Sequence, residues 1–298
     1  SNGDYYTHPA FTFESDNIRG FWMGKFELTG DNSKPTILPN ASSLRSQTVS
    51  SFSTMIQNMQ ISSNIYGLST SRTNTDSHMI TNMEWGAVAY LTNSKYGRCA
   101  SGSCTEVTIN NCSSYITGIG GDSISAYNSS STCTNSVNKY NGTKGVLAST
   151  TGNVTGIYDM SGGAFEYTMS NISSASGSYT FYSASSGFTS NWYTTSTSKY
   201  LTTYAYGTSQ NDQTAYNRVK LGDATGEVVL SSGGEGGWYS DYAYFSYSVN
   251  SWLLRSSDYY GSNDAGIFFF YYNNGSRYLS TGRVADDSSS RAVLVSLK

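Results

Sequence analysis

Apolar side chains recur at helical spacing in two stretches of the first hundred residues. In residues 42–59 they fall three or four positions apart, and a serine at the start can cap the first turn. In residues 76–96 the stripe is clearer. Asp76 or Ser77 can accept hydrogen bonds from the first free amides, and Gly97 stops the segment. We therefore expect two helices, the second with its stripe buried against a sheet.

Shorter alternating segments predict strands on both sides of these helices. Residues 5–29 favour two strands joined by a turn at residues 15–19, and residues 152–169 favour a core turn followed by a strand. Residues 265–272 predict a further strand, because Ile, Phe and Tyr are strong strand formers and Gly and Asn flank them. Residues 170–232 show little periodicity, which is typical of functional or mobile loops.

The strand at residues 265–272 has large rings on both of its faces. If Phe268 and Phe270 point into the core, strand alternation places Phe269 and Tyr271 on the opposite face, in water. A monomer seldom exposes contiguous large rings without a use for them, so we interpret that face as a recognition surface. The alternative is a strand buried within a sandwich.

The C-terminal tail, residues 252–298, combines a cluster of Phe and Tyr with Ser, Asn, Asp and Gly. Binding loops have this composition, because rigid rings supply contact area and small polar groups adapt to a partner. Residues 253–297 also lack Lys, Glu, Gln, Met and Trp, although all five occur earlier in the chain. No codon ending in a pyrimidine specifies any of the five. Given how often these five amino acids occur in the rest of the chain, a stretch of this length without any of them is uncommon. Their absence indicates a bias in the codons of the tail.

Composition limits the possible partners. Only 12% of the residues are charged, the formal net charge is -3, and no run of Lys and Arg occurs. A nucleic-acid partner is therefore not expected. The longest apolar runs are far too short to span a bilayer, which predicts a soluble chain. Residues 1–4 look like an expression scar or linker. We expect that any export segment or membrane anchor has been cut away with the native N-terminus.

All four cysteines lie in a polar insert at residues 98–142, which predicts a surface excursion. Their spacing matches no usual zinc site, so disulfides are the simpler interpretation. Of the three possible pairings we favour Cys99 with Cys104 and Cys112 with Cys133. Four free thiols are the alternative. Disulfides would place the protein in an oxidising compartment, outside the cytosol.

No catalytic constellation is apparent. The only histidines are His8 and His78, so a Ser/His/Asp or Cys/His relay cannot form in the second half of the chain. The sequence has no phosphate loop, HExxH motif, dinucleotide fingerprint or EF-hand loop. The sparse carboxylates show no spacing that favours glycoside chemistry. We expect no catalytic residue, no metal and no cofactor.

Four segments occur in the order of the signatures of a known fold: MEWGAVAYLTNSKYG, TGNVTGIYDMSGGAFEY, WLLRSS and SSSRAVL. They resemble, over residues 21–297, the Trp-containing helix start, the GNVWEW-like segment, the RGGSW-like strand and the GFR-like final strand of C-type lectin folds of the formylglycine-generating-enzyme type. Sulfatase-activating members use cysteines in the C-terminal part, where this chain has none, so their oxidase activity is not expected. The chain is similar instead to variable proteins of diversity-generating retroelements, in which mutagenesis of Asn codons rewrites C-terminal positions. The coding bias fits that process.

The resemblance implies one α+β domain over residues 5–298, a C-type lectin fold with two helices on a twisted, mainly antiparallel sheet. Residues 252–298 would be its variable ligand-binding segment. The implied ligand-binding positions are Leu254, Ser256, Asp258, Tyr260, Asp264, Phe269, Tyr271, Tyr272, Asn273, Asn274, Ser276, Tyr278 and Ser280. The energetic anchors among them would be Tyr260, Phe269, Tyr271, Tyr272 and Tyr278. The fixed scaffold would include Gly266, Phe268, Phe270, Val293, Arg255 and Arg291, with both arginines satisfying carbonyls or carboxylates inside the fold.

The implied function is non-catalytic recognition of a protein or glycan on a cell or particle surface. The protein would be extracellular, on a cell surface or a phage particle. Contact with a membrane is expected only through a lost N-terminal anchor, and an oligomer is possible. One alternative is an enzyme on the same fold, an oxidase or hydrolase that uses the glycine-rich centre. Another is a structural pilus or tail-fibre tip subunit. Calcium-dependent sugar binding is not expected, because no EPN-like or QPD-like triplet occurs.

Overall fold

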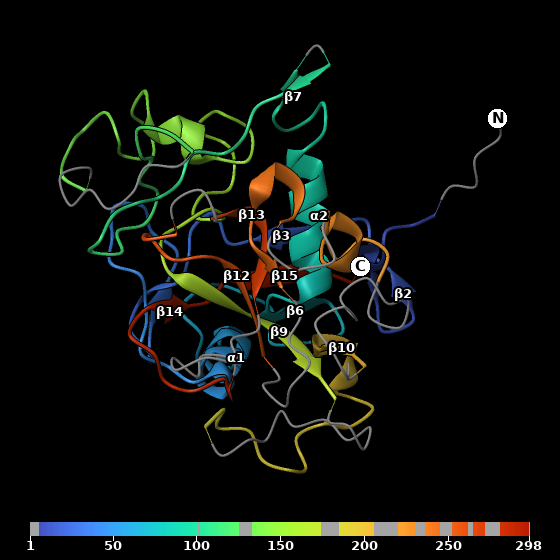
Figure 1. Ribbon diagram of the computed structural model, residues 1–298. Coiled ribbons are helices and arrows are strands. Elements are labelled where there is room, and N and C mark those ends of the chain that lie inside the picture. The colour runs from blue at the N-terminus through green and yellow to red at the C-terminus, as the bar shows by residue number, and fades with distance from the viewer. Residues whose placement is uncertain are drawn as a thin grey trace.

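The computed structural model describes residues 6–100, 102–124, 133–173, 185–205, 220–230, 236–244, 252–261, 265–271 and 281–297. These residues form an α+β structure (Figure 1). The α-helices are α1 (Val49–Gln57) and α2 (Asn82–Thr92). Short 3-10 helices span Pro9–Phe11, Asn58–Gln60, Gly145–Ala148, Ser198–Tyr200, Gly226–Val228 and Trp238–Ser240.

The largest sheet contains six described strands in the order β10-β9-β12-β13-β11, with β14 also paired to β9. They are β9 (Phe165–Ile172), β10 (Thr202–Tyr204), β11 (Ala243–Tyr244), β12 (Trp252–Ser256), β13 (Gly266–Tyr271) and β14 (Ser288–Ser289). Strand β12 is antiparallel to both β9 and β13, whereas β10, β11 and β14 pair in parallel. The strands predicted at residues 152–169 and 265–272 are confirmed as the neighbours of β12.

A second, antiparallel sheet brings the two ends of the described chain together. It has the order β3 (Phe21–Met23), β15 (Ala292–Ser296) and β6 (Thr75–Met79). The remaining strands form three two-stranded pairs: β1 (Thr12–Phe13) with β2 (Asp16–Asn17), β4 (Thr29–Gly30) with β5 (Pro35–Thr36), and β7 (Cys99–Ala100) with β8 (Ser103–Cys104). Because β15 lies between two N-terminal strands, the end of the tail is part of the frame.

Each helix packs against its own hydrophobic cluster. Trp85 of α2 is buried with Phe268 and Phe270 of β13, and its indole Nε1 donates to the carbonyl of Ile267 at 2.8 Å. Phe52 of α1 is buried in the other cluster, together with Phe269 of β13. Alternating residues of one strand therefore enter different clusters, so both faces of β13 are covered.

Both predicted helices begin later than expected. Helix α1 starts after Thr48, whose hydroxyl accepts from the amide of Ser51 at 3.1 Å. The first residues of the predicted second helix, from Asp76, belong to strand β6 and pair with β15. Helix α2 starts after Thr81, which forms a reciprocal capping box with Glu84. The predicted caps were wrong because both pairs of residues lie in extended backbone. Ser42 and Ser43 bridge to Ile116 and Thr29, and Asp76 and Ser77 pair with β15.

The favoured disulfide pairing is confirmed. Cys99 is bonded to Cys104, and Cys112 is bonded to Cys133. Such bridges are typical of proteins in an oxidising compartment. Among the described residues, no helix has the length and apolarity needed to cross a membrane.

Candidate functional site: a cleft beside the turn after β12

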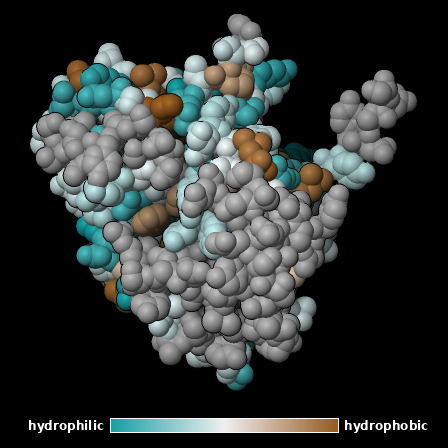
Figure 2. Space-filling model, in the orientation of Figure 1, coloured by the Kyte–Doolittle hydropathy of each residue, from teal (hydrophilic) through white to brown (hydrophobic). Residues whose placement is uncertain are grey.

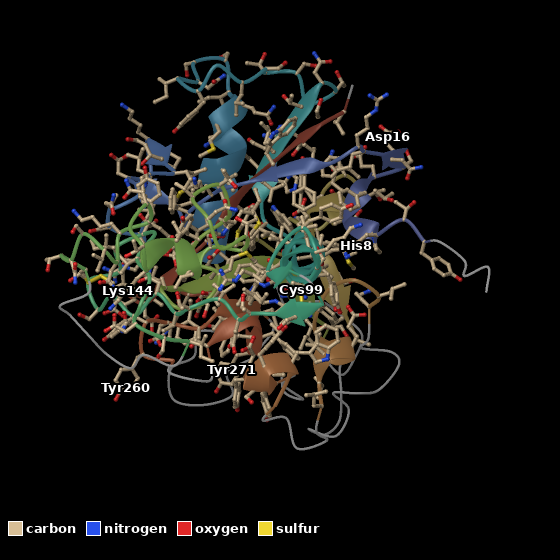
Figure 3. All side chains as sticks on the ribbon, turned by 90° about the horizontal axis from the view of Figure 1, so that it is seen from above. His8, Asp16, Cys99, Lys144, Tyr260 and Tyr271 are labelled. Atoms are coloured by element: carbon tan, nitrogen blue, oxygen red, sulfur yellow. A yellow bond between two sulfur atoms is a disulfide. The ribbon has the colours of Figure 1, made fainter. Side chains whose placement is uncertain are left out.

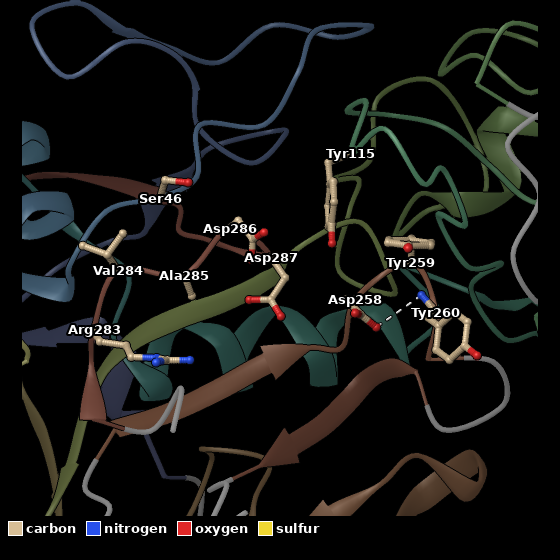
Figure 4. A pocket seen from close by; sticks show the side chains of 10 residues that line it. All are labelled: Ser46, Tyr115, Asp258, Tyr259, Tyr260, Arg283, Val284, Ala285, Asp286 and Asp287. Atoms are coloured by element: carbon tan, nitrogen blue, oxygen red, sulfur yellow. Dashed lines mark hydrogen bonds between the residues drawn. The ribbon is translucent and has the colours of Figure 1, made fainter. Parts of the chain in front are cut away.

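A cleft of about 740 Å³ opens beside the turn that follows β12. Four segments meet around it: the approach to α1, the disulfide-bearing insert, the turn after β12 and the segment before β14 (Figure 4). It is lined by Ser46, Tyr115, Asp258, Tyr259, Tyr260, Arg283, Val284, Ala285, Asp286 and Asp287. Two further grooves, of about 470 and 460 Å³, contain none of the predicted ligand-binding residues. The first cleft is therefore the candidate site.

The turn after β12 is held in place by hydrogen bonds to residues 159–163. The pairing of β12 with β13 shifts register at Ser256, and Ser256 and Ser257 adopt positive φ angles of 76° and 66°. The Ser256 hydroxyl lies within hydrogen-bond distance of the carbonyl oxygens of Asp159, at 3.0 Å, and Gly162, at 2.7 Å. The amide of Tyr259 donates to Gly163 at 2.9 Å. These bonds direct Asp258 and Tyr260 into the cleft wall.

Asp258 has a local role that explains its presence in this turn. Its Oδ1 accepts from the amide of Tyr260 at 3.2 Å, and its carbonyl accepts from Gly261 at 3.0 Å. An aspartate that accepts from the backbone two residues on is a common way to close a turn. Asp258 is only 7% exposed, whereas Tyr260 is 47% exposed. Asp258 thus lies deep in the cleft and Tyr260 lies at its rim.

The opposite wall, residues 283–287, is anchored to two other parts of the fold. The amide of Ser46 donates to Ala285, and the amide of Phe165 donates to Asp287, both at 2.9 Å. The guanidinium of Arg45 donates to the carbonyl of Asp286. This wall is therefore fixed to the approach to α1 and to the start of β9.

Tyr115 comes from the disulfide-bearing insert and forms the aromatic side of the cleft. Its amide donates to the carbonyl of Cys112 at 2.9 Å, and its carbonyl accepts from Ser43 at 2.8 Å. Its ring meets Tyr259 edge to face at 5.1 Å between centroids, while the Arg45 guanidinium lies 4.0 Å from its centroid. Burial raises the pKa of the Tyr115 hydroxyl, and the charges of Asp258 and Asp287 raise it further. The phenol is therefore neutral at physiological pH.

The predicted ligand-binding residues separate into three groups where the structure describes them: two line the cleft, one is half-buried elsewhere and three are buried. Asp258 and Tyr260 line the cleft. Tyr271 is half-buried elsewhere, with its ring centroid 5.3 Å from Tyr242 and 6.0 Å from Tyr244.

Leu254, Ser256 and Phe269 do not face solvent. Leu254 and Ser256 are fully buried and Phe269 is 4% exposed, so their assignment to an exposed face was wrong. The alternation of rings along β13 was correct, but its second face is covered by the cluster that contains α1. The remaining positions lie outside the described residues: Asp264, Tyr272, Asn273, Asn274, Ser276, Tyr278 and Ser280.

Most of the cleft was not predicted. No local pattern associates Ser46 or Tyr115 with the tail, because long-range packing brings these segments together. Tyr259 belongs to the aromatic cluster of the tail, and Asp286 and Asp287 form its acidic pair. Tyr259 could have been found because it lies between two predicted positions, whereas no local pattern in the sequence connects Asp286 and Asp287 with the rings.

The two predicted scaffold arginines have the expected role. Arg255 is fully buried and donates to the carbonyls of Asp223 at 2.5 Å and Ala224 at 2.9 Å, and to the side chain of Asn82 at 2.7 Å. This bonding holds residues 223–224 and the start of α2 against β12. The expectation that arginine satisfies buried carbonyls is confirmed here.

Arg291 occupies a buried cluster of carboxylates. Its Nε donates to Glu166 at 3.0 Å and its Nη1 to the carbonyl of Gly24 at 2.8 Å. Burial raises the pKa of Glu27 well above its ordinary range, and the charges of Asp159 and Glu166 raise it further. Arg291 thus stabilises a region where several carboxylates share one cation.

His78 is part of a structural network and does not line the cleft. It is buried between Asp76, at 3.0 Å from Nδ1, and Glu84, at 2.8 Å from Nε2. Burial alone lowers the pKa of His78, but the two carboxylates outweigh it and raise the pKa to about 9. Within the described ranges, no group of three or more His, Cys, Asp or Glu side chains could hold a metal ion.

On the face drawn in Figure 2, the coloured hydrophobic residues occur in small groups among hydrophilic ones and do not form one broad apolar patch. Recognition through a cleft with polar walls is compatible with that surface. Compared with known proteins, the sequence matches no family model and has no significant match among curated proteins. The interpretation of the cleft therefore rests on its own geometry and chemistry.

Proposed function

We propose that the protein is a non-catalytic recognition protein with a C-type lectin fold of the formylglycine-generating-enzyme type, and that the cleft is part of its ligand site. The observation that carries this proposal is the meeting of Asp258 and Tyr260, both implied to be variable, with residues from three other segments around one cleft. Variable side chains beside an anchored wall could change specificity without changing the frame.

The architecture supports the fold assignment in three ways. The tail begins in β12, which lies between β9 and β13, and it ends in β15, which lies between β3 and β6, so both ends of the segment are held in sheets. Two helices cover the clusters on the two sides of β13. Arg255 and Arg291 are fully buried in the segment itself, and they hold its strands to distant parts of the chain.

The proposed setting is a cell surface or a phage particle, and the proposed ligand is a macromolecule displayed on another surface. The coding bias of residues 253–297 supports diversification by a retroelement. Two disulfides support an oxidising environment.

Sequencing the DNA around the gene tests this function directly. We expect a near-identical repeat of the segment that encodes residues 252–298, with adenines at the codons of the variable positions, and a reverse-transcriptase gene beside it. If the surrounding DNA contains neither, the diversification part of the proposal is wrong.

A further inference from the structure

We propose that the cleft binds the guanidinium group of an arginine side chain on a protein ligand. This inference rests on the proposed function and specifies the chemistry of its ligand. It follows from three features that occur together: a cleft with a deep and a shallow end, an excess of carboxylates, and a wall of tyrosines that already packs against a guanidinium.

The dimensions of the cleft suit a side chain that enters from the surface. Its volume of about 740 Å³ lies in the usual range of ligand pockets. The nearly buried carboxylate of Asp258 marks its deep end, and the half-exposed ring of Tyr260 marks its rim. An extended arginine can place its charge near Asp258 while its aliphatic carbons lie along the tyrosine rings.

The charges of the lining favour a cation. Three aspartates, Asp258, Asp286 and Asp287, line the cleft, against the guanidinium groups of Arg283 in the lining and of Arg45 on the Tyr115 wall, so carboxylates outnumber cations. In Figure 4 the carboxylates of Asp258 and Asp287 lie between Arg283 on one side and the three tyrosines on the other. An arginine from a ligand would enter on the tyrosine side. A cleft with a net negative charge attracts cations.

The tyrosine wall favours arginine over lysine. Arg45 of the chain itself places its guanidinium 4.0 Å from the centroid of Tyr115, on the wall of this cleft. Tyr259 meets Tyr115 edge to face, and Tyr260 lies 6.2 Å from Tyr259 between centroids. A planar guanidinium can stack on such rings and at the same time donate a fork of hydrogen bonds to a carboxylate, which an ammonium group cannot do.

The first experiment uses small probes on the whole chain. N-acetyl-arginine N-methylamide is titrated and followed by ligand-observed NMR, in parallel with the citrulline analogue, which has nearly the same shape and no charge. We expect a dissociation constant on the order of 1 mM for the arginine probe and binding at least about tenfold weaker for citrulline. The lysine analogue should lie between them, and added salt should weaken the arginine probe most.

Charge-removing variants locate the site. Asp258→Asn and Asp287→Asn keep the shape of each side chain, and the asparagine that replaces Asp258 can still accept from the amide of residue 260. Each should weaken the arginine probe by about tenfold with little change in melting temperature. Asp16→Asn is the matched control, because Asp16 is exposed on β2, far from Tyr260 in Figure 3. It removes the same charge and should leave the affinity unchanged.

Two results would overturn this inference: equal affinity for the arginine and citrulline probes, or no arginine binding at 20-fold the expected dissociation constant, about 20 mM. Equal weakening by Asp16→Asn would also overturn it, since the effect would then come from overall charge. None of these binding results bears on the expected DNA repeat of the segment that encodes residues 252–298. Absence of the repeat, with arginine binding intact, would instead refute diversification alone.

Discussion

Two aromatic parts of the same tail have opposite positions in the structure. Residues 258–260 form a turn whose side chains line a cleft, whereas Phe268, Phe269 and Phe270 of β13 are buried in two hydrophobic clusters. Their compositions are alike, since both combine rings with Asp, Ser or Gly neighbours. The difference comes from the covering of both faces of β13. Binding-loop composition therefore identifies a region, and packing decides which of its rings can meet a ligand.

The largest contrast is expected between Arg283 and Arg291, two arginines that the structure describes after β13. Arg291→Ala should destabilise the protein by about 5 kcal/mol, because Glu166 and its neighbouring carboxylates lose their buried cation. Arg283→Ala, at the half-buried cleft wall, should cost less than about 1 kcal/mol. Urea unfolding measures both. If both variants lost a similar free energy of unfolding, the cleft wall would contribute to stability as much as the buried core does.

The next contrast concerns the rings of β13. Phe269→Ala should cost about 3 to 4 kcal/mol, since it leaves a cavity in the cluster that contains α1. Phe269→Leu is the control for volume and should cost roughly half as much or less. Equilibrium unfolding with both variants tests whether Phe269 belongs to the frame. If the alanine variant lost less than about 1 kcal/mol, the Phe269 ring would not be part of the core, and its assignment to the recognition surface would stand again.

A pH series compares the stability of the core with binding in the cleft, because the two should depend differently on pH. The folded-state pKa of His78 is about 9, above the ordinary 6.5, so its contribution to stability is complete below pH 6.5 and is lost as the pH rises to about 9. The linked loss is about 3 kcal/mol. His78→Gln should flatten this part of the stability profile. None of the cleft-lining residues is a histidine, so binding of the arginine probe should not follow the same curve.

The sequence predicted the elements with local signals better than the contacts between them. Strands were expected within residues 152–169 and 265–272 and occur at Phe165–Ile172 and Gly266–Tyr271, and both disulfides were predicted correctly, because alternation and loop closure are local features. The start of α2 was misplaced because strand pairing between β6 and β15 depends on residues more than two hundred positions apart.

Only a small part of the cleft was predictable, for the same reason. Asp258 and Tyr260 were found through the family resemblance and lie in it, but Tyr115 reaches it only through the folding of the insert. Phe269 was assigned to the wrong environment because strand alternation states which side chains share a face and not whether that face is covered. Burial of both faces is a property of the whole fold.

The smallest expected effect on stability is at the rim of the cleft, and it tests the comparison most closely. Tyr260→Ala should change the free energy of unfolding by no more than about 0.5 kcal/mol, because the ring is half-exposed. It should weaken the arginine probe about two- to fivefold, the size of an exposed cation–π contact. Tyr96→Ala is the matched control, since Tyr96 is 71% exposed and lies outside the cleft. If Tyr260→Ala cost about 2 kcal/mol or more, its ring would be part of the frame, as Phe269 is. Residues 258–260 would then be needed for stability and could not be replaced without cost to the fold.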